Sequence, residues 1–543
     1  MNRQIRRLAL GLMLCYVVLF AQLNNVQVFG AERLRDNPDN NREIVANYSR
    51  PRGTISTADG VVVARSVEVD TDLLRQREYP EGELFAQVSG FYSFHFGATG
   101  VEDSYDEELA GETSDLELRN LSDLFVERDR SGSVVLSIRS DVQQVARDAL
   151  GEREGSVVAL DVETGEVLAL WSYPSYDPNL VSAPDLEEAA AARDLYLLDE
   201  RDPMLGRAYQ QRYFPGSTFK IVTSVAGLES GLVTTDSPSY DAVASWTPPL
   251  TTRPISNNGD VCGGTLFEIL RVSCNSAFAE MGSLTLGPQV LLEGAESVGF
   301  NSAPPIDLPV PAVSVFPESF GDALETPGSD TVDPDQPGTI FEDTPSLALS
   351  SIGGFDVRAS PLHMALITAG IANNGRLPEP HVVREIRDAD GALVRTIEPE
   401  VWLSGMSPAT AATMREAMIG VVESGTGTGA RIPGYVVGGK TGTARVTNDP
   451  PQSHAWMVAF AGPPGETPQV AVAVVVLAQP GATETGGGRV AAPIARAVLE
   501  RALQPAPVPE AVDPNAPDGE VPADGTGDDA GAAPQASTAG RRR

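Results

Sequence analysis

The sequence contains almost no lysine. Of its 39 basic residues, counting Lys and Arg together, only Lys220 and Lys440 are lysines. An arginine keeps its proton near neutral pH, whereas a buried lysine can have its pKa lowered and act as a base. Both lysines lie inside short Ser, Thr and Gly motifs. This context favours a functional role over the chance retention of two surface lysines. We therefore expect them to serve in proton transfer or in the recognition of a charged group.

Cysteine, histidine and positive charge are also scarce. Three cysteines in 543 residues exclude a disulfide-dense scaffold. The four histidines are scattered without metal-ligand spacing, so we predict no metal and no other cofactor. A net charge of −35 argues against binding to nucleic acid and against peripheral binding to anionic lipid.

One long apolar run lies at the N-terminus. Residues 8–29 are about long enough to span a bilayer, and three arginines precede them. The positive-inside rule then places residues 1–7 in the cytoplasm and the rest of the chain outside. A signal peptide cleaved at Gly30-Ala31 is the competing interpretation. Because no clear A-x-A site is present, we favour an uncleaved single-pass anchor in the cell membrane.

The rest of the chain divides into two folded segments and a tail, which predicts an α+β multidomain protein. Residues 32–150 hold short strand signals, and Asp141 is expected to cap a helix near their end. No catalytic constellation is seen there, so we interpret this part as a pedestal or docking module. Residues 155–504 begin and end with β-rich runs, which predicts one five-stranded antiparallel sheet flanked by helices. Residues 505–543 are rich in Pro, Ala, Gly and Asp, and we expect a disordered tail.

A serine precedes the first lysine by three positions in the stretch Phe214-Pro215-Gly216-Ser217-Thr218-Phe219-Lys220. A serine hydroxyl is a weak nucleophile unless a base removes its proton. If Ser217 opens a helix, Lys220 lies on the same face and reaches that hydroxyl. The apolar residues that follow predict a buried helix, which would lower the pKa of the lysine. On these residues alone, a capping serine and a surface lysine remain a common alternative.

Two further stretches add polar groups. In an extended or loop segment, Ser273 and Asn275 point the same way and can hold a lysine and a substrate amide. A third stretch lies on a predicted strand, and its hydroxyl and ammonium groups suit a substrate carboxylate. The residues of this third stretch are Lys440, Thr441, Gly442 and Thr443.

The order S-x-x-K, S-x-N and K-T-G resembles the signature of the penicillin-binding protein and serine β-lactamase superfamily. Further stretches resemble class B penicillin-binding proteins, most of all the actinobacterial PbpA type. These stretches are Arg52–Ile55, Gly97–Glu102, Trp171–Asn179, Ser273–Phe278, Ser351–Gly353, Ala359–Leu362 and Ala372–Gly375. The resemblance covers residues 1 to about 504. It implies an extracytoplasmic transpeptidase domain on an N-terminal β-rich pedestal or dimerisation-like domain, with one transmembrane helix.

The resemblance also implies an activity and its residues. The activity is that of a D,D-transpeptidase, which cross-links peptidoglycan stem peptides ending in D-Ala-D-Ala and is acylated by β-lactam antibiotics. The implied catalytic residues are Ser217, Lys220, Ser273 and Asn275. The implied substrate-binding residues are Lys440, Thr441, Gly442 and Thr443, and the backbone N–H groups of Ser217 and Thr443 would form an oxyanion hole. The implied partner is a polytopic SEDS-type membrane glycosyltransferase.

The alternatives to a transpeptidase are a β-lactamase, a β-lactam sensor and a carboxypeptidase. A β-lactamase needs a deacylating base, and no convincing Glu-x-x-Leu-Asn lies between the second and third motifs. A β-lactam sensor needs a signalling part, which seven residues before the anchor do not supply. A carboxypeptidase, which uses water as the acceptor, remains an open alternative.

Two further residue types have structural interpretations. A disulfide between Cys262 and Cys274 is possible outside the membrane and would brace the second motif. His454 is expected to be structural.

Overall fold

The protein is described here from a computed structural model. The described residues are 2–24, 48, 50–70, 74–117, 130–257, 260–448, 451–478 and 486–506. Parts of three predictions lie outside these ranges. They are the anchor beyond Asn24, the possible cut site at Gly30-Ala31 and the tail from residue 507 onward.

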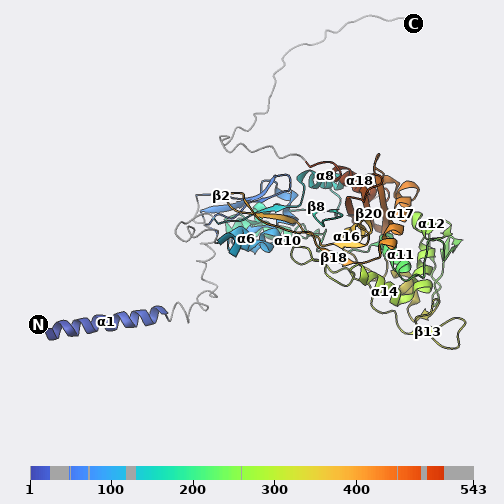
Figure 1. The fold of residues 1–543 in the computed structure, drawn as a ribbon, viewed down its shortest axis with the longest axis horizontal. Helices are drawn as coiled ribbons and strands as arrows, with labels where there is room; N and C mark the ends of the chain where they lie inside the picture. The colour runs from blue at the N-terminus through green and yellow to red at the C-terminus, as the bar shows by residue number, and fades with distance from the viewer. Residues whose placement is uncertain are drawn as a thin grey trace, which may run out of the picture. The chain divides into compact units, whose positions relative to one another are not determined.

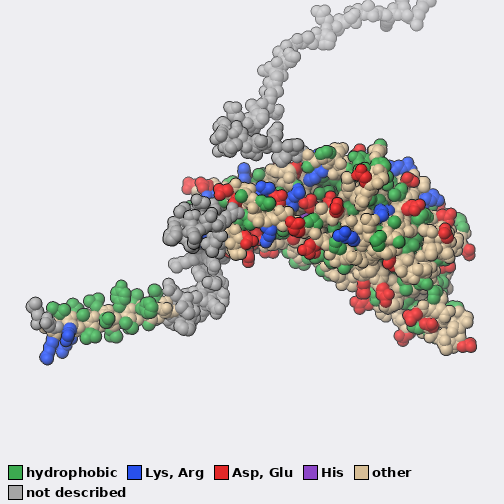
Figure 2. All heavy atoms as spheres, viewed as in Figure 1, with side chains coloured by type: hydrophobic (Ala, Val, Ile, Leu, Met, Phe, Trp, Pro, Cys, Tyr) green, Lys and Arg blue, Asp and Glu red, His purple; other side chains and the backbone are tan. Residues whose placement is uncertain are grey.

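Helix α1 (Asn2–Asn24) is, within the described part of the chain, the one helix long and apolar enough to cross a membrane. Its apolar segment, Arg3–Asn24, has 22 residues and a hydropathy of 1.6. Such a helix is about 33 Å long, close to the thickness of the hydrocarbon core. Figure 2 shows hydrophobic side chains along most of this helix and basic ones at its N-terminal end. The helix begins before the predicted apolar run, so the three arginines lie in its first two turns.

A five-stranded antiparallel sheet forms the centre of the larger folded part, which confirms the predicted sheet. Its strands come from both ends of the segment, as expected. Four of the neighbouring strands contain runs of Val and Ala that are buried almost without interruption, as a sheet covered on both faces requires. In sheet order the strands are β19 (Val436–Asn448), β20 (Pro451–Gly462), β21 (Val470–Val476), β7 (Gly155–Asp161) and β8 (Val167–Tyr173).

Helices cover both faces of this sheet (Figure 1). Helix α16 (Pro361–Ala372) packs on β7, β20 and β21, and every one of its residues is buried, as expected of a helix that is apolar all round. Helices α8 (Ser140–Leu150) and α18 (Ala491–Ala502) pack against each other and on the sheet. Helix α17 (Pro408–Ser424) packs against α16 and β19. The sheet is therefore the rigid support for the residues that follow.

The N-terminal part contains a second sheet that a later segment completes. The hairpin of β16 and β17 lies inside the segment 155–504, yet β16 pairs antiparallel with β6. The sheet of the N-terminal part therefore includes strands from a later segment, because strand pairing follows position in space and not sequence. In sheet order the strands are β17 (Leu393–Thr396), β16 (Val383–Arg387), β6 (Ser133–Leu136), β1 (Ile55–Ser56), β2 (Val62–Glu68) and β3 (Arg75–Glu78).

Shorter elements connect these sheets and helices. The helical ones are η2 (Gly82–Leu84), α4 (Ala86–Ser89), α5 (Val101–Ser104), α6 (Asp106–Ala110), α7 (Ser114–Glu117), α9 (Pro178–Val181), α10 (Leu186–Leu198), η4 (Gly216–Phe219), α11 (Lys220–Glu229), α12 (Leu266–Arg271), α13 (Asn275–Glu280), η5 (Met281–Leu286), α14 (Gly287–Ser297), α15 (Thr344–Ser350) and η6 (Thr428–Ala430). The strands are β4 (Tyr92–Ser93), β5 (Gly97–Ala98), β9 (Tyr240–Val243), β10 (Ser245–Trp246), β11 (Ile255–Ser256), β12 (Cys262–Gly264), β13 (Ala323–Glu325), β14 (Ile340–Phe341), β15 (Arg376–Pro378) and β18 (Val401–Ser404).

The start of α8 differs from the prediction that Asp141 caps this helix. The helix begins at Ser140, and Arg139 is its N-cap without a side-chain cap bond. Asp59, from the turn between β1 and β2, supplies the missing acceptor, since its Oδ1 accepts the Ser140 N–H at 2.9 Å. Asp141 instead binds Arg139 through its carboxylate. The prediction was wrong because the capping group comes from a distant segment, which local sequence does not reveal.

A buried carboxylate links several parts of the N-terminal segment. The Glu102 side chain is fully buried, and its two oxygens accept from Arg52 Nε at 2.7 Å and from Arg77 Nε at 2.6 Å. Burial raises the pKa of this carboxyl, but the two guanidinium groups outweigh burial and hold its pKa below the ordinary value. The carboxylate therefore stays charged and ties β3 to the loop before β1.

Replacing Glu102 with glutamine is expected to lower the free energy of unfolding by about 3–5 kcal/mol, because it leaves buried arginines without a counter-charge. Urea unfolding of the detergent-solubilised protein, followed by circular dichroism, measures this loss. Glu78→Gln is the matched control, since the Glu78–Arg65 pair is roughly half-exposed and should contribute less than about 1 kcal/mol. Equal losses in the two variants would contradict a structural role for the buried pair.

Candidate active site

Ser217 lies in a turn that is held on two sides. It was predicted to open a helix, but it occupies the 3-10 segment η4, and α11 begins only at Lys220. Gly216 has a positive φ of 53°, and its N–H donates to the Gly353 carbonyl at 3.0 Å. A Cβ on Gly353 would lie 2.1 Å from the Gly216 oxygen, so only glycine is compatible with this contact. The Ser351–Gly353 segment therefore fixes the turn from one side.

Strands β19 and β20 fix the same turn from the other side. The Trp456 indole N–H donates to the Phe214 carbonyl at 3.0 Å. A Cβ on Gly442 would lie 2.8 Å from the Pro215 oxygen, so the absence of a side chain lets β19 approach the turn closely. The approach brings Thr443 and Ser217 to the same cleft.

Ser273 and Asn275 lie on the connection between α12 and α13. Ser273 has a φ of +60°, in the left-handed region that a residue other than glycine adopts at a cost. Its N–H donates to the Leu270 carbonyl at 3.1 Å, and a disulfide joins Cys274 to Cys262 of β12. Asn275 is the first residue of α13. The flanking helices and the disulfide therefore hold this strained backbone in place.

The two lysines meet at Ser273. Lys220 Nζ donates to the Ser273 carbonyl at 2.8 Å and to Asn275 Oδ1 at 2.7 Å, and lies 3.2 Å from Ser273 Oγ. Lys440 Nζ donates to the same Ser273 Oγ at 2.8 Å. Among the described residues, Ser217 is not one of the hydrogen-bond partners of Lys220. Such contacts are often long without substrate, so the geometry keeps Lys220 a candidate base.

Burial and mutual repulsion set the charge of this pair. Both lysine side chains are fully buried. Burial lowers the pKa of Lys220 well below its ordinary value, and the charge of Lys440 lowers it further. Burial alone lowers the pKa of Lys440 to about 7. Two ammonium groups around one hydroxyl repel each other, and this repulsion adds to burial in favouring the neutral form of Lys220.

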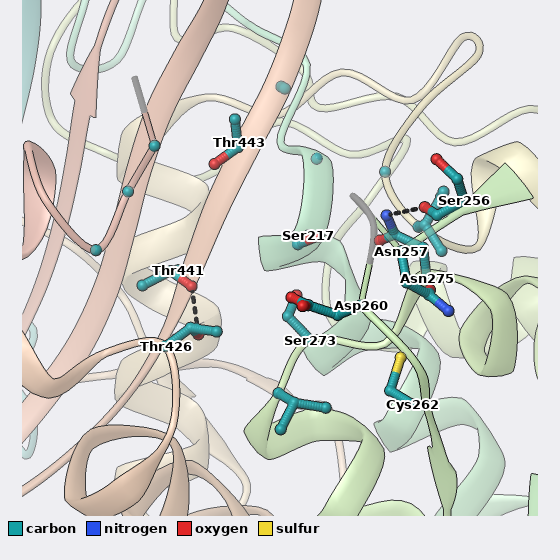
Figure 3. A pocket seen from close by; sticks show the side chains of 18 of the residues that line it. Ser217, Ser256, Asn257, Asp260, Cys262, Ser273, Asn275, Thr426, Thr441 and Thr443 are labelled. Carbon is teal, nitrogen blue, oxygen red and sulfur yellow. Dashed lines mark hydrogen bonds between the residues drawn. The ribbon is translucent and has the colours of Figure 1, made fainter. Parts of the chain in front are cut away.

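A cleft of about 1380 Å³ contains most of the predicted residues. Ser217, Ser273 and Asn275 line one side, and Thr441 and Thr443 of β19 face them across the opening (Figure 3). Lys220 and Lys440 lie beneath this surface. The predicted catalytic and substrate-binding residues are thus gathered at one site.

Sequence reasoning missed one polar contact at this site. Thr426, which follows α17, lines the cleft, and its hydroxyl lies 2.6 Å from that of Thr441 (Figure 3). No signal in the sequence singled out Thr426.

His454 lies outside the cleft lining. Its Nδ1 accepts from the Ala478 N–H at 3.0 Å, and burial lowers its pKa to about 4. The described residues contain no cluster of His, Cys, Asp or Glu suited to a metal.

Two family models match most of this chain. Residues 155–500 match the model of the penicillin-binding protein transpeptidase domain, and residues 52–135 match that of the penicillin-binding protein A dimerisation domain. The chain is 38% identical to the peptidoglycan D,D-transpeptidase PbpA of Mycolicibacterium smegmatis, over 93% of this chain and 99% of that protein. It is 37% identical to PbpA of Mycobacterium tuberculosis, over 93% of this chain and 100% of that protein.

Solved structures of penicillin-binding protein A are also similar to this chain. The penicillin G acyl-enzyme complex of penicillin-binding protein A from M. tuberculosis has a TM-score of 0.72 and 36% identity, over 84% of this chain and 100% of that chain. The ceftriaxone acyl-enzyme complex has a TM-score of 0.73 over 85% of this chain and 100% of that chain. The resemblance to the PbpA type that the motifs predicted is confirmed. The chain therefore belongs to the family of penicillin-binding protein transpeptidases and resembles its PbpA members over nearly its whole length.

Proposed function

We propose that this protein is a peptidoglycan D,D-transpeptidase that works through an acyl-enzyme on Ser217. The observation that supports the residue assignment best is the buried pair of lysines around Ser273, both with lowered pKa values, beside the cleft that Ser217 lines. In this proposal residues 155–504 carry the chemistry. Residues 32–150 form the pedestal, which β16 and β17 complete.

Acylation begins with the donor stem peptide. Lys220 takes the proton of Ser217, and Ser217 Oγ attacks the carbonyl carbon between the two terminal D-alanines. The backbone N–H groups of Ser217 and Thr443 stabilise the negative oxygen that forms. The C–N bond then breaks, and Ser273 passes the proton to the leaving D-alanine amine. A β-lactam follows the same path, but its ring opening leaves the amine tethered to the acyl group.

Binding groups on both sides of the cleft orient the donor. Lys440, Thr441 and Thr443 bind the terminal carboxylate, since an ammonium and two hydroxyls match its charge and its acceptor oxygens. Asn275 donates to the backbone of the peptide while its Oδ1 holds Lys220. In the second half of the reaction an amine of a neighbouring stem peptide attacks the ester, forms the new peptide bond and releases Ser217.

The location follows from α1. With three arginines in its first two turns, the positive-inside rule favours a cytoplasmic N-terminus, a span of the cell membrane and an extracytoplasmic catalytic part. A polytopic SEDS-type glycosyltransferase, which would polymerise the glycan strands, is the partner we propose for the anchor and pedestal. The family resemblance supports this partner.

Product analysis tests the activity. The purified protein is incubated with a donor peptide ending in D-Ala-D-Ala, with and without a peptide that carries a free amine, and the products are identified by mass spectrometry. A transpeptidase yields free D-alanine and the joined peptide. Release of D-alanine without any joined peptide would mean a carboxypeptidase, and rapid turnover of penicillin would mean a β-lactamase.

A further inference from the structure

The acidic residues of the cleft lining lie on one of its two walls. On the β19 side, the lining includes the exposed Arg445 and Arg489. Lys440 is buried within the same strand as Arg445. On the opposite side, the acidic lining residues are Asp260 and Glu268. The cationic wall is the one assigned above to the donor carboxylate. The two acidic residues of the other wall have no role in that assignment.

Of the two acidic residues, only Asp260 is available to a ligand. Glu268 is used within the fold, because its Oε2 accepts the Thr265 N–H at 2.8 Å in the capping box of α12. The exposed Asp260 carboxylate makes none of the side-chain hydrogen bonds or ion pairs found in the described part of the chain. Arg271, the basic residue on this wall, reaches the Ser424 carbonyl at 3.5 Å.

The segment that carries Asp260 is tied on both sides to the second motif. On the N-terminal side, the Ser256 carbonyl accepts from Asn275 Nδ2 at 2.9 Å. On the C-terminal side, Cys262 forms the disulfide with Cys274. In Figure 3 the Asp260 side chain points into the cleft and is seen below Ser217 in that view. Asp260 thus lines the same cleft as the reacting serine.

We propose that Asp260 binds the protonated amine of the acceptor peptide and thereby favours an amine over water in the second half-reaction. This inference rests on the proposed function. The bound ammonium releases one proton to solvent, and the neutral amine attacks the Ser217 ester. The new N–C bond forms as the C–Oγ bond breaks, and the second proton passes through Lys220 to Ser217 Oγ.

Acceptor competition tests the role of Asp260. The full chain in detergent is given a D-Ala-D-Ala donor together with glycinamide, an amine that is cationic in water, or methanol, a neutral acceptor. Asp260→Asn is expected to raise the KM for glycinamide about fivefold, the size of a single close charge contact in water. Methanolysis and the rate of penicillin acylation should stay unchanged, and Asp260→Glu should restore amine transfer. The difference should shrink as salt is raised.

Asp236→Asn is the matched control, because Asp236 is exposed and lies outside the cleft lining. It should change neither acceptor. An unchanged KM for glycinamide in Asp260→Asn overturns the inference, and so does an equal loss with methanol, which would indicate a distorted site. A wild type that is acylated by penicillin keeps the proposed function whatever Asp260 does. A wild type that neither labels nor transfers overturns both.

Discussion

Ser217→Ala is expected to abolish covalent labelling of the protein by a fluorescent penicillin. The label is attached through an ester to the nucleophile. Removing that hydroxyl therefore prevents the ester from forming and does not merely slow the acylation. Wild-type protein should give a stable fluorescent band on a denaturing gel, and the variant should give none. Because Ser217 lies in a turn and is not part of the buried core, the variant should fold, which circular dichroism checks.

Ser256→Ala is the control for this experiment. Ser256 lines the same cleft, but it is the backbone carbonyl of this residue, unaffected by the substitution, that accepts from Asn275. Its labelling should stay within about twofold of wild type. A band that persists in Ser217→Ala, or one that disappears equally in Ser256→Ala, would place the nucleophile elsewhere.

Lys220→Arg is the second change with a large expected effect. Arginine keeps the positive charge and the donor groups but does not release its proton near neutral pH. If Lys220 is the base, the acylation rate should fall about 10³-fold, within the usual range for the loss of a general base. Stopped-flow measurement of penicillin acylation gives this rate. Lys440→Arg, which keeps the cation that binds a carboxylate, should cost far less.

The pH dependence of acylation gives an independent readout. Burial and Lys440 lower the pKa of Lys220, and only its neutral form accepts the serine proton. The wild-type rate should therefore be lost as the pH falls through this lowered pKa and recover as the pH rises above it. Lys220→Arg should lack this limb of the profile. A variant that retains both the rate and the limb would show that another group is the base.

Local patterns in the sequence predicted the site better than they predicted the fold around it. Stretches at both ends of residues 155–504 indicated five strands, and the three motifs indicated residues most of which line one cleft in the structure. The partners of Lys220 were only partly predicted, because three-residue spacing favoured contact with Ser217, whereas the strained backbone at Ser273 brings its carbonyl and hydroxyl to the lysine. A positive φ at a serine leaves no trace in composition or periodicity.

Long-range partners account for the rest of what was missed. The cap of α8 comes from Asp59, and the strand beside β6 comes from residues 383–387. Alternation within a segment predicts that a strand forms but not which strand lies next to it. Thr426 was missed for the same reason, since its significance lies entirely in its contact with Thr441.

The shared sheet has a consequence for any attempt to isolate the catalytic part. A chain trimmed to residues 155–506 would contain the whole match to the transpeptidase model but would lose β6. Strand β16 would then present a bare edge of backbone N–H and C=O groups to water. Such an edge recruits strands from other molecules, so the trimmed protein should aggregate. The sheet therefore crosses the boundary between the two matched family models, and the N-terminal segment covers the edge of a strand that comes from the transpeptidase segment.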